Sequence, residues 1–205
     1  MAEVLTNYAA ELDDAKMPAG KKKVLKTALK LFSSNGFHAT TTAQIAKRAG
    51  VSEGTIYKYF SSKDDLLAKL LRPVIAEIKG NFFGQLSGFA NLEQLVEFVV
   101  NNRLQFIAAN FDFVRLIAQE ALTGNLPPEL YSGMVTGPNG FLIQMTKIQE
   151  SFPEVNQELT PLQIARIFIG PVLTHALQTQ LFKAPGSQAD LALIQRQIIA
   201  CLTLK

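Results

Sequence analysis

The chain has 205 residues and a net charge of +3, and 48% of its residues are hydrophobic while 18% are charged. This composition can bury a core and excludes a disordered chain, and the small charged fraction indicates that a partner covers part of the surface. The single cysteine, Cys201, excludes an intrachain disulfide framework and a cysteine-rich metal site. Because neither a secretory signal nor a membrane span is recognisable, we expect a cytoplasmic protein without membrane contact.

Residues 1–18 are polar and acidic and end in Met17-Pro18, which is typical of a flexible N-terminal arm. Residues 21–35 are predicted to form an amphipathic helix, because apolar residues recur along one face. Asn35-Gly36 is a helix-stop signal. The apolar face consists of Val24, Leu25, Ala28, Leu29 and Phe32.

Short helices follow, each opened by a hydroxyl side chain suited to an N-cap. Thr41 begins a helix that ends at Gly50, Ser52 begins a second that runs to about residue 60, and Ser62 begins a third. Asp65 lies three residues after Ser62 and completes a variant capping box.

The first two of these helices match the requirements of a helix-turn-helix. The crossing needs a small residue, which Ala46 supplies, and the turn needs a residue that tolerates a positive φ, which Gly50 supplies four positions later. The second helix must then present polar and aromatic groups to the major groove of DNA.

The rest of the chain reads as helical, with no sustained alternation that would indicate strands. We therefore predict an all-α fold with a helix-turn-helix domain over residues 19–66 and a second, larger helical domain over residues 67–205. Pro73 and Pro171 fall inside helical patterns and are expected to kink them. The predicted helices span residues 63–80, 91–109, 112–123, 127–150, 160–182 and 187–203.

Basic charge is concentrated in one segment. Residues 21–69 contain ten Lys or Arg against three Asp or Glu, whereas residues 70–205 contain nine against ten. Such a segment is typical of a phosphate-binding module, although a solvated basic face would give the same count.

Between Gly36 and Leu66 the sequence resembles the TetR family of tetracycline-repressor-like regulators. The resemblance covers, in order and at matching spacing, residues 36–42, Ile45-Ala46, residues 49–60 and residues 62–66. It implies an all-helical homodimer that docks two reading heads on a palindromic operator, and a variable C-terminal domain that binds an inducer.

The resemblance also assigns candidate contacts to double-stranded operator DNA. Tyr59 is alternatively a core aromatic, and Lys63 is alternatively a solvated lysine. Glu53 departs from the basic residue of many members, and it either accepts a hydrogen bond from a cytosine or complements the helix dipole. The candidates are Thr41, Thr42, Ser52, Gly54, Thr55, Tyr57, Lys58, Tyr59 and Lys63.

The C-terminal region is rich in phenylalanine, and an aromatic-lined cavity would suit an apolar or aromatic small molecule. Ordinary core packing explains most of these rings. For His175, a packed or dimer-buried position is the alternative to facing a ligand. The candidate ligand-binding residues are Phe98, Asn102, Phe106, Phe141 and His175.

The last two predicted helices carry little charge, so we expect them to pair across a two-fold axis in a homodimer. The only charged residues between Thr160 and Leu204 are Arg166, Lys183, Asp190 and Arg196.

These features predict a ligand-responsive transcription repressor that is released from its operator by a small-molecule inducer. The alternative is a DNA-binding dimer without a small-molecule effector, regulated by protein partners. No nucleophile with a base, no acid pair and no metal-ligand set is recognisable, so neither an enzyme nor a cofactor or metal site is expected.

Overall fold

The computed structural model describes residues 7–14, 16–126, 135, 137 and 140–204. Within these residues every regular element is a helix, which confirms the all-α prediction. The chain divides into two compact units, one made of Met1–Ala76 with Asn110–Tyr131 and the other of Glu77–Ala109 with Ser132–Lys205. Among the described helices, none combines the length and the apolar character needed to cross a membrane.

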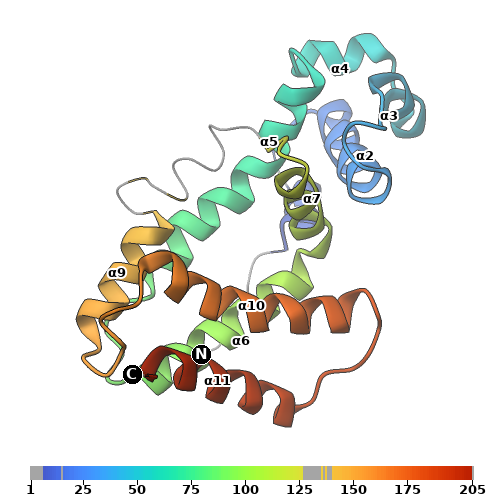
Figure 1. Cartoon of the computed structure of the whole chain (residues 1–205). Coiled ribbons are helices and arrows are strands. Elements are labelled where there is room, and N and C mark those ends of the chain that lie inside the picture. The colour runs from blue at the N-terminus through green and yellow to red at the C-terminus, as the bar shows by residue number, and fades with distance from the viewer. Residues whose placement is uncertain (1–6, 15, 127–134, 136, 138–139, 205) are drawn as a thin grey trace. The chain divides into compact units, whose positions relative to one another are not determined.

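The first unit contains the predicted helix-turn-helix. Its helices are α1 (Tyr8–Asp14), α2 (Ala19–Asn35), α3 (Thr42–Ala49), α4 (Glu53–Tyr59), most of α5 (Lys63–Glu77) and α7 (Phe111–Leu122) (Figure 1). The apolar face predicted for residues 21–35 is the buried face of α2. It packs in this unit with the buried side chains Phe37, Ile45, Ile56, Phe60 and Leu66.

The N-terminal segment differs from the flexible arm predicted for residues 1–18, because Tyr8–Asp14 is helical. The backbone N–H of Tyr8 donates to Asn110 Oδ1 at 2.9 Å, and the Tyr8 ring meets Phe113 edge-on at 6.5 Å between centroids. These partners lie about a hundred residues downstream, so local composition could not indicate them.

Helix α7 also belongs to the first unit, which therefore extends beyond the predicted residues 19–66. Its inward face buries Phe113, Leu116 and Glu120. A contribution from a helix so far along the chain is a long-range packing effect that periodicity alone does not report.

The second unit is built from η1 (Ile78–Phe82, a π-helix), α6 (Leu92–Ala109), α9 (Phe141–Ser151), α10 (Pro161–Gln180) and α11 (Gln188–Thr203) (Figure 1). Thr160 and Ser187 open α10 and α11 with capping boxes. The helix predicted at 127–150 is described from Phe141 onward, and most of its earlier part lies outside the described residues. The core includes Leu95, Val96, Ile164, Ile198 and Leu202.

Candidate functional site

The helix-turn-helix is fixed by local hydrogen bonds at the residues that the sequence indicated. Thr41 caps α3 in a capping box with Gln44, and Ser52 caps α4 by accepting from the N–H of Thr55 at 3.2 Å. Gly50 adopts φ 66°, the left-handed conformation that the turn was predicted to need. These bonds fix the first residues of α3 and α4, and Gly50 forms the turn between them.

Helix α4 presents a polar outer surface, the recognition face, made of Ser52, Glu53, Gly54, Tyr57 and Lys58, all exposed. Tyr57 is 53% exposed, whereas a tyrosine that only stabilises the fold usually buries most of its ring. An exposed aromatic hydroxyl beside a lysine on a short helix is well suited to bases and phosphates.

Thr42, at the start of α3, is hydrogen-bonded to this face. Its hydroxyl donates to Glu53 Oε1 at 2.5 Å and lies 3.3 Å from the Tyr57 hydroxyl. The cluster joins a candidate residue of α3 to two residues of α4. The Glu53 carboxylate therefore has a side-chain partner in addition to the helix N-terminus.

Gly54 has open space around its Cα. A Cβ built there would meet only Ser52 Oγ, at 3.8 Å, which is an ordinary contact. Folding of the free protein thus does not require glycine at this position. The missing side chain would let another molecule approach the backbone closely at this exposed position.

Thr55 and Tyr59 are half-buried and pack against α2. A Cβ at Gly20 would lie 3.3 Å from the Thr55 methyl group and 3.7 Å from the Tyr59 ring. Lys58 Nζ lies 5.7 Å from the centroid of that ring. Tyr59 is thus a packed residue with a partly exposed edge, between the two roles considered from the sequence.

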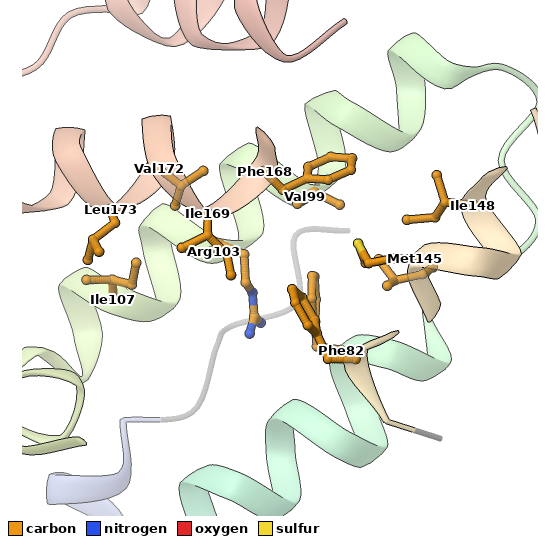
Figure 2. Close-up of a pocket in the computed structure, with 12 residues that line it drawn as sticks. Phe82, Val99, Arg103, Ile107, Met145, Ile148, Phe168, Ile169, Val172 and Leu173 are labelled. Atoms are coloured by element: carbon orange, nitrogen blue, oxygen red, sulfur yellow. The ribbon is translucent and has the colours of Figure 1, made fainter. Parts of the chain in front are cut away.

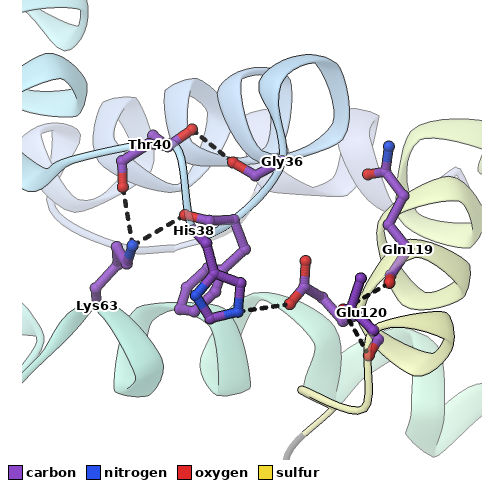
Figure 3. A network of polar contacts seen from close by, with 8 residues as sticks. Gly36, His38, Thr40, Lys63, Gln119 and Glu120 are labelled. Atoms are coloured by element: carbon purple, nitrogen blue, oxygen red, sulfur yellow. Dashed lines mark hydrogen bonds and ion pairs between the residues drawn. The ribbon is translucent and has the colours of Figure 1, made fainter.

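Lys63, predicted to contact phosphate, donates inside the unit. Its Nζ gives hydrogen bonds of 2.9 Å to the carbonyl oxygens of Phe37 and Thr40, and it lies 4.3 Å from the centroid of the Phe37 ring (Figure 3). The lysine therefore ties the turn after α2 to the first residue of α5.

Figure 3 also shows His38 in the same turn, pointing toward Glu120 of α7. His38 Nε2 lies 3.6 Å from Glu120 Oε2; the histidine is exposed and the carboxylate is buried. His38 and Glu120 are far apart in the chain, so no local sequence pattern links them.

The second unit contains a cavity of about 170 Å³ whose wall is apolar except for one residue. The charged exception is Arg103 of α6 (Figure 2). Helices α6, α9 and α10 and the end of η1 contribute to the wall. It consists of Phe82, Leu86, Val99, Arg103, Ile107, Phe141, Met145, Ile148, Phe168, Ile169, Val172 and Leu173.

Arg103 is tightly surrounded. The carbon of its guanidinium lies 3.7 Å from the centroid of the Phe82 ring and 4.8 Å from that of Phe106. Its Nη2 donates to Glu77 Oε1 at 3.4 Å and to Asn102 Oδ1, which also accepts from Nε at 2.9 Å. Opposite charge and two rings thus stabilise the cation at a largely buried position.

The structure brings only some of the predicted ligand residues to this cavity. Phe141 lies in the wall, and Asn102 and Phe106 contact Arg103. Phe98 instead stacks on Phe82, with centroids 6.3 Å apart, and meets Phe89 in a tilted arrangement with centroids 5.2 Å apart.

His175 lies away from the apolar cavity, in a more polar depression beside the loop that precedes α11. A Cβ on Gly186 would be 2.6 Å from the His175 ring, so the histidine is packed against this glycine. Nearby, hydrogen bonds from Ser187 lower the pKa of Asp190, which completes the cap of α11.

Sequence reasoning did not single out Arg103 or Glu77. A lone arginine on a helix usually reads as a solvated residue, and its partner is 26 positions away. The one available signal was an arginine within an otherwise apolar and amide-rich stretch of α6.

Helix α10 exposes an apolar row along one side, formed by Leu162, Ile169, Leu173, Leu177 and Leu181. Leu193 of α11 and Leu204, the residue that caps the C-terminus of α11, are exposed as well. A row of this length on a helix with few charges is typical of a surface that another chain covers.

Residues 24–70 match the family model described as bacterial regulatory proteins, tetR family. This range begins within α2 and ends within α5, so it includes the recognition face.

Curated relatives match about half of the chain at low identity. A fatty acid metabolism regulator protein of Bacillus subtilis is 25% identical over 104 residues, which is 51% of this chain and 54% of that protein. An HTH-type transcriptional repressor of Rhodococcus jostii is 27% identical over 109 residues, or 53% of each. The chain spans about half the length of these relatives.

Solved structures share the fold over nearly the whole chain. A TetR family transcription regulator from Marinobacter aquaeolei gives a TM-score of 0.75 at 16% identity and covers 96% of this chain and 100% of that one. A transcriptional regulator of Bacillus subtilis, solved in complex with stearoyl-CoA, gives 0.64 at 20% identity and covers 88% and 97%. At these identities the likeness establishes the fold alone.

Proposed function

We propose that the chain is a transcriptional regulator of the tetR family and that it works as a dimeric repressor that a small molecule releases from a palindromic operator. The observation that carries the proposal is the recognition face of α4, held by caps at Thr41 and Ser52 and exposing Tyr57. The relatives reported above are named as regulators and none as an enzyme, in line with the expectation of a non-catalytic protein.

The recognition face supports direct reading of the major groove. Gly54 permits close approach of the backbone, and Lys58 extends from the exposed surface. The Thr55 methyl packs toward Gly20 of α2, so Thr55 offers its hydroxyl, which lies 2.9 Å from Ser52 Oγ. Thr41, Thr42 and Ser52 supply hydroxyls and helix N-termini for the phosphates. Lys63 Nζ already donates to two carbonyl oxygens within its own unit. We therefore assign Lys63 to positioning the turn after α2 rather than to contacting DNA directly.

The exposed apolar row on α10 and the exposed Leu193 of α11 support a homodimer through these helices. Two heads are needed because a palindromic operator presents half-sites about 34–36 Å apart.

The apolar cavity favours a ligand-responsive regulator over one controlled only by protein partners. Relatives and neighbours include a fatty acid metabolism regulator and a structure with stearoyl-CoA, and such ligands carry apolar chains. Release requires the ligand to bind more tightly to a conformation that fits the operator less well. Helix α5 is continuous from Lys63 to Glu77. Lys63 at its first position holds the turn after α2, and Glu77 at its last position accepts a hydrogen bond from Arg103.

The test is fluorescence anisotropy of the purified protein with its own upstream intergenic DNA, titrated with salt. Sequence-selective binding by two protomers, weakening steeply with salt, is expected because phosphate contacts release counterions. The variant Tyr57→Ala should lose selective binding, whereas Lys147→Ala, an exposed lysine of the second unit, serves as the matched control. Weak binding that ignores sequence would refute the assignment of α4 as a specific reader for this DNA.

A further inference from the structure

We propose that the apolar cavity of the second unit selects an uncharged hydrocarbon group about the size of one aromatic ring and discriminates against carboxylates. This inference rests on the proposed function and names the chemical class that the ligand site accepts. It follows from the lining of the cavity, its size, and the way in which Arg103 is neutralised.

The lining offers nothing for a polar ligand group to bind except Arg103. Eleven of its residues are aliphatic or aromatic, or carry the methionine thioether, as Met145 does. Burying a hydroxyl, an amide or a charge against such a wall costs free energy unless a partner compensates it. A ligand therefore gains from apolar surface and loses with each polar atom placed inside.

The volume of about 170 Å³ sets the size of the group. An engineered apolar cavity of about 150 Å³ remains dry and binds benzene. A single ring with a short branched substituent fits this space, whereas a complete stearoyl chain would have to extend outside it.

The charge of Arg103 is already balanced. Glu77, only 6% exposed, accepts from its Nη2, and Asn102 accepts twice. The Phe82 ring covers one face of the guanidinium at 3.7 Å. The wall therefore presents the aliphatic stem and a neutralised head rather than an isolated cation.

An anionic ligand would disturb this balance. A carboxylate that paired with Arg103 would compete with the buried Glu77 carboxylate for the same guanidinium, and the two anions would repel each other in a medium of low dielectric. Removing one partner of a buried pair is strongly unfavourable. A neutral ligand leaves the Arg103–Glu77 pair intact and avoids this penalty.

The open edge of the cavity is apolar too. Ile169 and Leu173 line it and are 49% and 38% exposed. Both belong to the apolar row of α10, so a partner packed on that row would close this edge with further apolar surface. A charged tail at the edge would then be desolvated as well.

Two isosteric probes distinguish the alternatives. Isobutylbenzene carries an isopropyl group where phenylacetate carries a carboxylate, so the two differ in charge far more than in shape. The readout is the methyl resonance of Met145, one of four methionines and part of the wall. The full-length protein is labelled on its methionine methyls, and Met145→Leu assigns the signal.

In the unmodified protein, isobutylbenzene is expected to shift the Met145 signal saturably, and phenylacetate to bind at least about tenfold more weakly. Glu77→Gln removes the counter-charge and should strengthen phenylacetate binding by about tenfold while leaving isobutylbenzene unchanged. Glu97→Gln, at an exposed position of the same helix as Arg103, is the matched control and should change neither.

If Glu77→Gln does not fold, the double variant Glu77→Gln/Arg103→Met removes the pair together and should keep isobutylbenzene binding. Stronger binding of phenylacetate to the unmodified protein would overturn the proposal. So would the absence of a Met145 shift with either probe, since the cavity would then be filled by a partner side chain.

Operator anisotropy in the same samples separates this inference from the proposed function. If isobutylbenzene binds but operator affinity does not fall, the cavity accepts uncharged ligands as proposed, but its occupation does not release the protein from DNA. If neither probe shifts the Met145 signal but a different compound releases the protein from its operator, this inference is refuted and the proposed function still holds.

Discussion

Replacing Lys63 by methionine tests whether this lysine positions the turn or contacts phosphate. The substitution keeps the apolar stem and removes two hydrogen bonds of 2.9 Å from a charged donor to the carbonyls of Phe37 and Thr40. Each such bond contributes about 1.5–3 kcal/mol when buried. Lys63 is half-buried, so water replaces part of the loss, and we expect the variant to lose about 2 kcal/mol of unfolding free energy.

Thermal unfolding followed by circular dichroism at 222 nm measures this loss. For a protein of this size a decrease of about 2 kcal/mol lowers Tm by about 4–8 °C. The control is Lys58→Met, because Lys58 is exposed on the recognition face and has no carbonyl partner among the described hydrogen bonds. Lys58→Met should retain Tm and lose operator affinity.

The opposite pattern would refute the reasoning. If Lys63→Met unfolds at the temperature of the unmodified protein and loses operator affinity with a smaller salt slope, the lysine is a phosphate contact. The two internal bonds would then contribute little to stability in solution.

Three further results are expected. Gly54→Ala should fold with equal or greater stability, because a Cβ meets only Ser52 Oγ at 3.8 Å, yet bind operator more weakly in anisotropy. The pKa of Asp65 lies below its ordinary value of 3.8 because Lys69 donates to it, followed by the N–H of Ser61. Its stabilising contribution is thus present above pH 3.8 and is lost as the pH falls through the lower folded value, so Asp65→Asn should flatten urea-midpoint curves measured from pH 5 downward. Leu177→Glu should convert the dimer to a monomer in sedimentation at micromolar concentration, and an unchanged dimer would place the interface elsewhere.

The sequence predicted those features that depend on neighbouring residues. Thr41, Gly50 and Ser52 act within four positions of their partners, through caps and a left-handed turn, and each was found in its predicted role. The buried face of α2 followed from helical periodicity for the same reason. Local rules suffice where the interaction is local.

Features that depend on distant residues were not predicted. Tyr8 is ordered by Asn110, and His38 faces Glu120, across separations that no periodic pattern encodes. The hydrogen bond between Arg103 and Glu77 likewise joins residues 26 positions apart. Phenylalanine content indicated an apolar site, but which rings would form its wall depended on packing among α6, α9 and α10.

A neutral ligand must act on the operator through packing, since it leaves the Arg103–Glu77 charges paired. A tenfold change in operator affinity corresponds to about 1.4 kcal/mol. At about 25 cal/mol per Å² of apolar surface, the two conformations need differ by only about 55 Å² in the area they bury against the ligand. That is less than half the surface of one aromatic side chain, so a rotamer change of Phe82, which covers Arg103 and lines the cavity, is large enough to supply the difference.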